Sequence, residues 1–187
     1  MNNCIGITNE EKFERAFKFM IVNEGGFSNH PNDRGGATNH GITQATLAAW
    51  KGHPVSVEQV RQLTLDDVKP IYKKNYWDIN SLDGVHSAPV ATCVFDIGVV
   101  CGTGSAGKLA QAVCNTHGGA LLLLDGQIGP KSVAAINGMD EEIFVRAFAD
   151  RVGARFRSIV DNNPSQRVFL AGWMNRANRL LTLIPKI

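Results

Sequence analysis

The sequence lacks any long apolar run. No uncharged stretch approaches the roughly 18 residues that a membrane-spanning helix requires, so we do not expect an integral membrane protein. Low-complexity disorder is excluded as well, because 44% of the 187 residues are apolar. The N-terminus also lacks the cationic start and apolar core of an export signal, which predicts a chain made in the cytoplasm without classical export.

An excess of charge of one sign is also missing. Nineteen Lys and Arg residues against 17 Asp and Glu give a net charge of +2, far below what nucleic-acid binding normally needs, so no nucleic-acid partner is expected. Residues 141–187 alone hold eight basic and four acidic side chains, a net +4. That excess is typical of solvated amphipathic helices, and it would also suit an anionic polymer.

Cysteine is scarce and unevenly placed. The four cysteines are Cys4, Cys93, Cys101 and Cys114. They form no Cys-x-x-Cys pair and have no histidine at zinc-site spacing, so we expect reduced thiols, no metal site and no disulfide framework. No motif in the chain requires a cofactor.

Most of the chain carries the apolar period of a helix. A Thr-x-x-Glu capping box at Thr8 is followed by Phe13, Phe17 and Met20 at helical spacing. Strict alternation of apolar and polar residues is almost absent, whereas residues 27–42 are rich in Asn, Asp and Gly. The sequence therefore predicts an all-α fold with a long loop or small β-hairpin after the first helix. Loops of such length are often functional.

Glu24 has an unusual position for a charged residue. It follows Met20 by four residues and so continues the apolar stripe of the first helix. Desolvation disfavours the charged form of a carboxyl group, and a carboxyl that keeps its proton suits general acid catalysis. The alternative is a frayed helix end, at which Glu24 is solvated or pairs with Lys18 or Arg34.

A second carboxylate, Asp33, lies inside the Gly-rich loop. A solvated loop carboxylate stays ionised, so Glu24 and Asp33 would form the acid-and-base pair of glycoside hydrolysis. Activation of water by Asp33 implies inversion, whereas carboxyl groups only about 5 Å apart would imply retention. Thr38 and Thr43 could each position the water. Ordinary turn chemistry explains Asp33 as well, and a helix cap explains Thr43.

Five long motifs lie in order along the chain. They are Glu24–Thr43, Tyr72–Asp78, Phe95–Gly98, Asp125–Pro130 and Gly172–Arg176. Together they resemble glycoside hydrolase family 108, the lysozyme-like N-acetylmuramidases of phage endolysins and bacterial genomes. The last three resemble the family's C-terminal peptidoglycan-binding region, and the resemblance covers roughly residues 13–184.

The resemblance implies a lysozyme-like helical fold. The implied reaction is hydrolysis of the β-1,4 bond between N-acetylmuramic acid and N-acetylglucosamine, with no cofactor. Residues 1–87 would form the catalytic half and residues 88–187 a helical peptidoglycan-binding half, packed into one compact unit.

The resemblance also implies roles for particular residues. Glu24 matches the family's catalytic acid. Glu24, Asp33 and Thr38 are together similar to the Glu, Asp and Thr triad of tailed-phage lysozymes, with one residue fewer between the last two. The candidates for substrate binding are Tyr72, Asp96, His40 and Thr43. For the first two of these a structural role stays open.

The implied partner is the glycan strand of peptidoglycan. The implied role is host lysis by a monomeric phage or prophage endolysin, made in the bacterial cytoplasm, released by a holin-dependent route and active in the periplasm or cell wall. Two alternatives stay open. One is a lytic transglycosylase, which closes an anhydro ring instead of adding water. The other is a non-catalytic peptidoglycan-binding or secretion-associated protein.

Overall fold

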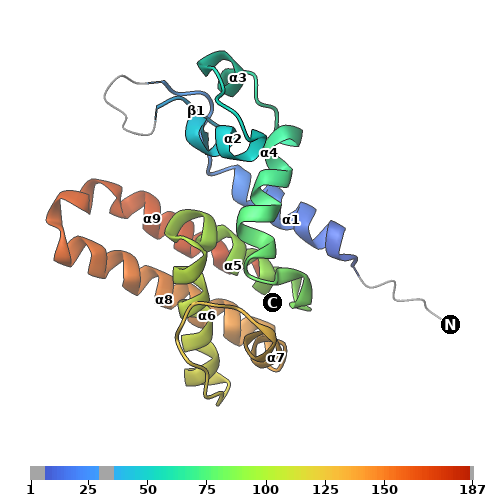
Figure 1. Cartoon of the computed structure of the whole chain (residues 1–187). Coiled ribbons are helices and arrows are strands. Elements are labelled where there is room, and N and C mark those ends of the chain that lie inside the picture. Colours follow the sequence, from blue (N-terminus) through green and yellow to red (C-terminus); the bar gives the residue numbers. More distant parts are fainter. Residues whose placement is uncertain (1–6, 30–35, 186–187) are drawn as a thin grey trace.

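The computed structural model describes residues 7–29 and 36–185, and helices dominate these ranges (Figure 1). The elements are α1 (Asn9–Ile21), β1 (Thr38–Asn39), β2 (Ile42–Thr43), α2 (Gln44–Lys51), α3 (Val57–Arg61), α4 (Leu65–Tyr72), the π-helix η1 (Lys73–Asp78), the 3-10 helix η2 (Leu82–Gly84), α5 (Ala88–Cys101), α6 (Thr103–His117), α7 (Pro130–Asn137), α8 (Glu141–Asn162), η3 (Pro164–Gln166), α9 (Arg167–Arg179) and η4 (Leu180–Leu183). The predicted all-α fold with a small hairpin after the first helix is confirmed.

Short polar side chains open several of the helices. The Glu11 backbone N–H donates to the Thr8 hydroxyl at 3.2 Å, and the Thr8 N–H donates to the Glu11 carboxylate at 2.9 Å. Ser56 and Thr64 begin α3 and α4 with the same reciprocal pair. These bonds satisfy N–H groups that lack a partner in the first helical turn. The starts of these helices are therefore set by local sequence.

A tight hairpin follows α1. β1 and β2 are antiparallel with Thr38 opposite Thr43, and the Ser28 and Thr38 backbones exchange two hydrogen bonds of 2.8 Å. The two turn residues, His40 and Gly41, have φ values of 47° and 76°. Positive φ at both positions is typical of the type I′ turn, which matches the twist of the strands. The backbone conformation of His40 and Gly41 thus fixes the shape of the turn.

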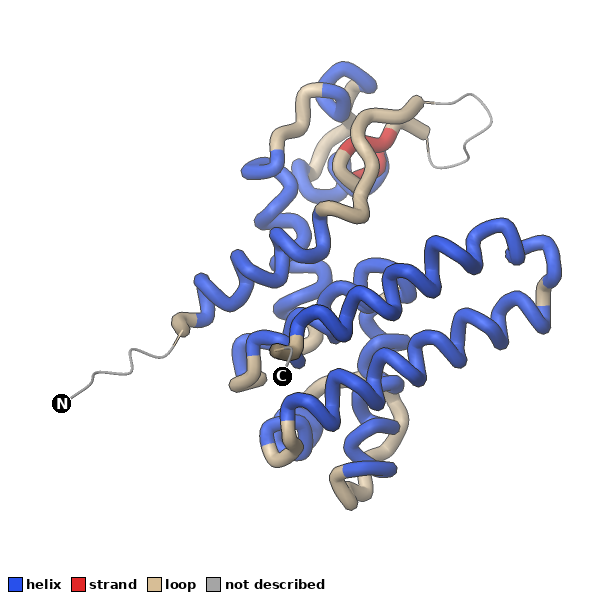
Figure 2. Tube along the Cα trace, turned by 180° about the vertical axis from the view of Figure 1, so that it is seen from behind, coloured by secondary structure: helices blue, strands red, loops and turns tan. Residues whose placement is uncertain are grey.

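α5 forms the centre of the molecule. Its residues 90–98 are all buried, and α1, α6 and α8 pack against it. The hairpin, α2 and α3 lie at one end of the molecule, while α6 and α7 lie at the other (Figure 1). α8 and α9 run side by side, as the view from behind also shows (Figure 2). The N-terminal and C-terminal elements thus share one continuous core.

An aromatic cluster fixes α1 against this core. The Phe13 ring lies 5.3 Å from the Trp77 ring and 5.8 Å from the Phe95 ring, both in edge-on geometry. These three side chains come from α1, η1 and α5, and each is essentially inaccessible to solvent. Edge-on aromatic pairs stabilise beyond their buried area. The first half of α1 is therefore anchored to the core.

The close packing of α6 on the turn before α7 requires glycine. A Cβ on Gly107 would collide with the backbone oxygen of Gly126, which cannot rotate away. Gly107→Ala is expected to lower the free energy of unfolding by about 1–3 kcal/mol, the usual cost of overpacking, as measured by urea denaturation. Gly104→Ala, in the same helix, is the control because a Cβ there meets no atom within 4 Å. Equal stability of the two variants would contradict this packing.

Candidate active site

Glu24 lies just past the end of α1. The helix ends at Ile21, and two tighter turns carry the chain onward, with Asn23 N–H donating to Met20 O at 3.1 Å and Glu24 N–H donating to Ile21 O at 3.0 Å. Turns of this kind commonly satisfy the last carbonyl groups of a helix. The prediction that Glu24 continues the helix is therefore wrong. Its side chain is nevertheless mostly enclosed, with 18% of its surface exposed.

The Glu24 carboxylate has a charged partner. Nη1 of Arg176, on α9, donates to Glu24 Oε1 at 3.2 Å across 152 residues of sequence. Glu24 therefore contacts a mostly buried cation, and not only the apolar stripe that its spacing predicts. The alternative partner Arg34 lies outside the described residues. Arg176 reaches Glu24 because the packing of α9 brings it there, and no local sequence pattern encodes that contact.

Asp96 holds the same arginine. Nε and Nη2 of Arg176 donate to the two Asp96 carboxylate oxygens at 2.9 Å each. The Asp96 side chain is 0% exposed, and burial raises its pKa, while the hydrogen bonds and charge of Arg176 oppose that rise. Burial also works against the charge of Arg176, but the two carboxylates outweigh it and raise the pKa of the guanidinium. Such full burial favours the structural role that was left open for Asp96.

Two tyrosines face the same carboxylate. Tyr72 ends α4 and Tyr76 lies in the π-helix η1, and their rings are 5.6 Å apart. Burial raises the pKa of both phenols, and the nearby charge of Glu24 raises it further. Both therefore stay neutral at physiological pH and can donate a hydrogen bond. Tyr76 was not among the predicted site residues, although its spacing of four from Tyr72 could have indicated it.

The Tyr72 hydroxyl ties the hairpin to α4. It donates to the backbone oxygen of His40 at 3.0 Å, so His40 contributes to this region through its main chain. Tyr72→Phe removes the bond and is expected to lower the free energy of unfolding by about 1 kcal/mol at neutral pH. Thermal unfolding of both proteins measures this difference.

The same pair of proteins should respond differently to alkaline pH. Burial raises the pKa of Tyr72, so the native state keeps the phenol proton when the unfolded chain loses it above about pH 10. The native state then binds more protons, and the wild type loses stability as the pH rises. We therefore expect the stability advantage over Tyr72→Phe to shrink above about pH 10. A constant difference from neutral to alkaline pH would contradict this.

The hairpin turn approaches Glu24 directly. A Cβ on Gly41 would lie 2.7 Å from Glu24 Oε2 and would collide with the Tyr72 hydroxyl. Only a residue without a side chain lets the backbone come this close. Gly41 was not a predicted site residue, although a glycine in the Gly-rich stretch after α1 was a visible signal.

Thr38 and Thr43 make their hydrogen bonds away from this cluster. The Thr38 hydroxyl donates to Gly36 O at 3.4 Å, and Thr43 caps α2 by accepting from Thr46 N–H at 3.1 Å. Within residues 7–29 and 36–185, neither threonine is hydrogen-bonded to Glu24. The contacts of Thr43 are therefore those of a helix cap, which was the alternative role given for it. Asp33 lies outside the described residues.

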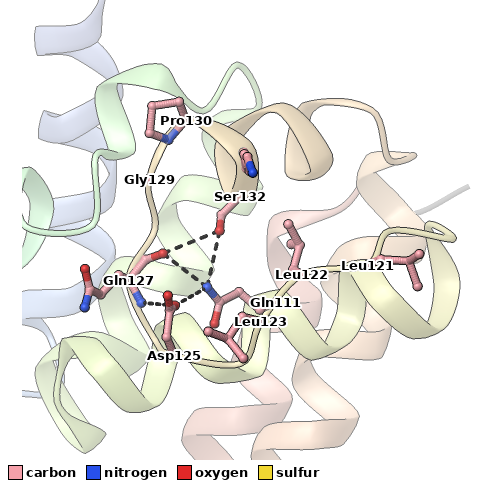
Figure 3. A pocket seen from close by; sticks show the side chains of 10 residues that line it. Gln111, Leu121, Leu122, Leu123, Asp125, Gln127, Gly129, Pro130 and Ser132 are labelled. Carbon is pink, nitrogen blue, oxygen red and sulfur yellow. Dashed lines mark hydrogen bonds between the residues drawn. The ribbon is translucent and has the colours of Figure 1, made fainter.

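A separate pocket lies between α6 and α7 (Figure 3). Gln111 is at its base, and Nε2 of Gln111 donates to Asp125 Oδ1 at 2.7 Å and to Gln127 O at 3.1 Å. The Gly126 N–H donates in turn to Gln111 Oε1 at 2.9 Å. These polar groups satisfy one another, so they fix the turn before α7. Leu121 and Leu123 stand at the rim with exposed side chains.

Residues 7–29 and 36–185 contain no cluster of three or more His, Cys, Asp or Glu side chains that could bind a metal ion. Within the same ranges, every helix is too short or too polar to span a bilayer.

Comparison with known proteins identifies both parts of the chain. The family model of glycosyl hydrolase 108 matches residues 17–102, and that of a predicted peptidoglycan domain matches residues 107–178. The solved structure of Brucella abortus SagA is 33% identical, covers 92% of this chain and 93% of its own, and superposes with a TM-score of 0.74. No curated protein matches the chain. The chain therefore belongs to glycosyl hydrolase family 108, and it is a glycoside hydrolase that acts on peptidoglycan.

Proposed function

We propose that the enzyme is an N-acetylmuramidase that hydrolyses the β-1,4 bond between N-acetylmuramic acid and N-acetylglucosamine, with Glu24 as the general acid. The observation that carries this proposal is the setting of Glu24. Its carboxylate is mostly enclosed, it is oriented by Arg176, and it lies beside two neutral phenols, of which Tyr72 donates its proton to the His40 backbone oxygen. An acid held in this way can protonate a leaving oxygen at a fixed position.

In this mechanism Glu24 transfers its proton to the glycosidic oxygen as the bond to the sugar carbon breaks. The sugar develops oxocarbenium character, and Asp33 accepts a proton from a water molecule that attacks the opposite face of the ring. The configuration at the anomeric carbon is thereby inverted. Thr38 would help to position the water, and both Thr38 and Gly36 adjoin the segment that carries Asp33.

His40 and Thr43 are proposed to lie along the bound glycan, and Tyr72 is proposed to act on the same binding site indirectly. Tyr72 itself is almost fully buried, so we assign its influence to the hairpin that it anchors through His40. Asp96 is fully buried and would act through Arg176.

Mass spectrometry of the products released from purified peptidoglycan tests this reaction. Hydrolysis adds one water molecule, so muropeptides that end in reducing N-acetylmuramic acid are expected. Products lacking that water would show a lytic transglycosylase. Binding to intact peptidoglycan without any released reducing ends would show a non-catalytic wall-binding or secretion-associated protein. Reducing N-acetylglucosamine would place the cut at the other glycosidic bond.

For the cellular role we propose a phage or prophage endolysin that is made in the cytoplasm, acts as a monomer, and reaches peptidoglycan in the periplasm through a holin. The matches to a glycosyl hydrolase and to a predicted peptidoglycan domain support a lytic role. Induction in a Gram-negative host with and without a co-expressed holin tests it. Lysis only when the holin is present is expected, and equal lysis in both cultures would contradict holin-dependent release.

A further inference from the structure

Arg176 makes more and shorter hydrogen bonds to Asp96 than to Glu24. Besides the two 2.9 Å bonds to the Asp96 carboxylate, Nη2 of Arg176 reaches the Asp96 backbone oxygen at 3.3 Å. A side-on pair of this kind fixes the plane of the guanidinium group. The remaining nitrogen, Nη1, makes a single 3.2 Å bond to Glu24. Asp96 therefore sets the direction from which Arg176 meets Glu24.

The charges of this triad also matter. When all three groups are ionised, two carboxylates surround one guanidinium, and only the Glu24 end is partly open to water. A lone guanidinium next to Glu24 would favour the ionised form and would oppose uptake of the proton that a general acid must carry. Asp96 offsets that positive charge. Arg176 can thus orient Glu24 while its charge is shared with Asp96.

Arg179, on the same helix as Arg176, is a second cation that acts on Asp96 and donates to Asn23, the residue before Glu24. Tyr72 on α4 and Tyr76 on η1 are held neutral because burial raises the pKa of each phenol. The hairpin turn offers only the backbone of Gly41. Asp33 lies outside the described residues. Among the groups that the structure places beside Glu24, the charge of Arg176 and its offset by Asp96 should therefore dominate.

We propose that Arg176 is a positioning residue that orients Glu24 for proton donation, and that Asp96 holds Arg176 and offsets its charge. Arg176 belongs to the match with the predicted peptidoglycan domain, residues 107–178, whereas Glu24 and Asp96 belong to the hydrolase match, residues 17–102. The C-terminal region thus completes the active site, whatever else it binds. This role rests on the proposed function of Glu24 as general acid.

The pH dependence of kcat separates this role from a purely structural one. On the alkaline side, activity falls as the general acid loses its proton. Asp96→Asn leaves the charge of Arg176 without its offset, so the alkaline limb is expected to move to lower pH. Arg176→Gln removes the cation, so the limb is expected to move to higher pH. Because Glu24 is then less well oriented, kcat should also fall by about 100-fold with a smaller change in KM.

Two further variants serve as controls. Arg179 lies one helical turn after Arg176, and it donates to Asn23 Oδ1 and to the backbone oxygen of Phe19 rather than to Glu24. Arg179→Lys loses the paired hydrogen bonds of the guanidinium, so it should lower the thermal midpoint. Because it keeps the charge, it should leave the pH profile in place. Arg176→Lys keeps the charge without the side-on pair. It should leave the alkaline limb near that of the wild type and restore only part of kcat.

Loss of folding is separated from loss of positioning by the double variant. Asp96→Asn combined with Arg176→Gln removes both buried charges and leaves neutral amides at both positions, and its alkaline limb should follow that of Arg176→Gln. If all folded variants keep the wild-type alkaline limb while Glu24→Gln is inactive, the positioning role of Arg176 is wrong, whereas the role of Glu24 as general acid stands. If Glu24→Gln is active, the proposed function fails first, independently of Arg176.

Discussion

Glu24→Gln is expected to remove nearly all hydrolysis of peptidoglycan while leaving the fold intact. General acid catalysis contributes about 10²–10⁴-fold to rates of this kind, and an amide cannot donate the required proton. The side chain is 18% exposed and its bond to Arg176 is a single one, which an amide oxygen can also accept. The thermal midpoint should therefore stay close to that of the wild type. Turbidity clearing of permeabilised Gram-negative cells measures the loss.

Glu14→Gln provides the matched control for this variant. Glu14 lies on α1, and its carboxylate pairs with Lys69 Nζ at 2.8 Å, away from the Glu24 cluster. The same chemical change should cost less than about 1 kcal/mol of stability, as partly exposed ion pairs usually do, and should leave turbidity clearing unchanged. Substantial clearing by Glu24→Gln would exclude Glu24 as the general acid.

The parts of this fold that could be predicted depend on neighbours in sequence. The capping box of Thr8 and Glu11 needs only four residues, and the helical spacing of Phe13 and Phe17 identifies the buried face of α1. The Gly-rich stretch after α1 likewise indicated a loop or hairpin, because few residues adopt the conformations that it needs. Glu24 was selected by the same local spacing, even though the helix ends at Ile21.

The contacts that define the site are those that local patterns could not supply. Arg176 meets Glu24 across 152 residues and Asp96 across 80. Both contacts depend on how α9 packs, which is decided by the whole core. An isolated Arg on an amphipathic helix is most often solvated, so its spacing alone carried no signal. The sequence could therefore indicate the acid, but not the charge that orients it.

Gly41→Ala is expected to impair activity and stability together. Gly41 has a φ of 76°, which costs an alanine about 1–2 kcal/mol. Its Cβ would also lie 2.7 Å from Glu24 Oε2 and would collide with the Tyr72 hydroxyl. Relief of these contacts requires the turn or the carboxylate to move. A displacement of about 1 Å at a catalytic group can lower the rate by about 100-fold.

Gly52→Ala separates the two causes. Gly52 ends α2 with a φ of 75°, almost the same as that of Gly41, but a Cβ there meets no atom within 4 Å. It should therefore show the backbone cost in thermal unfolding and keep the wild-type rate of turbidity clearing. If Gly41→Ala loses no more activity than Gly52→Ala does, any loss reflects the positive φ alone. A much larger loss in Gly41→Ala would show that the approach of the hairpin turn determines where the Glu24 carboxylate lies.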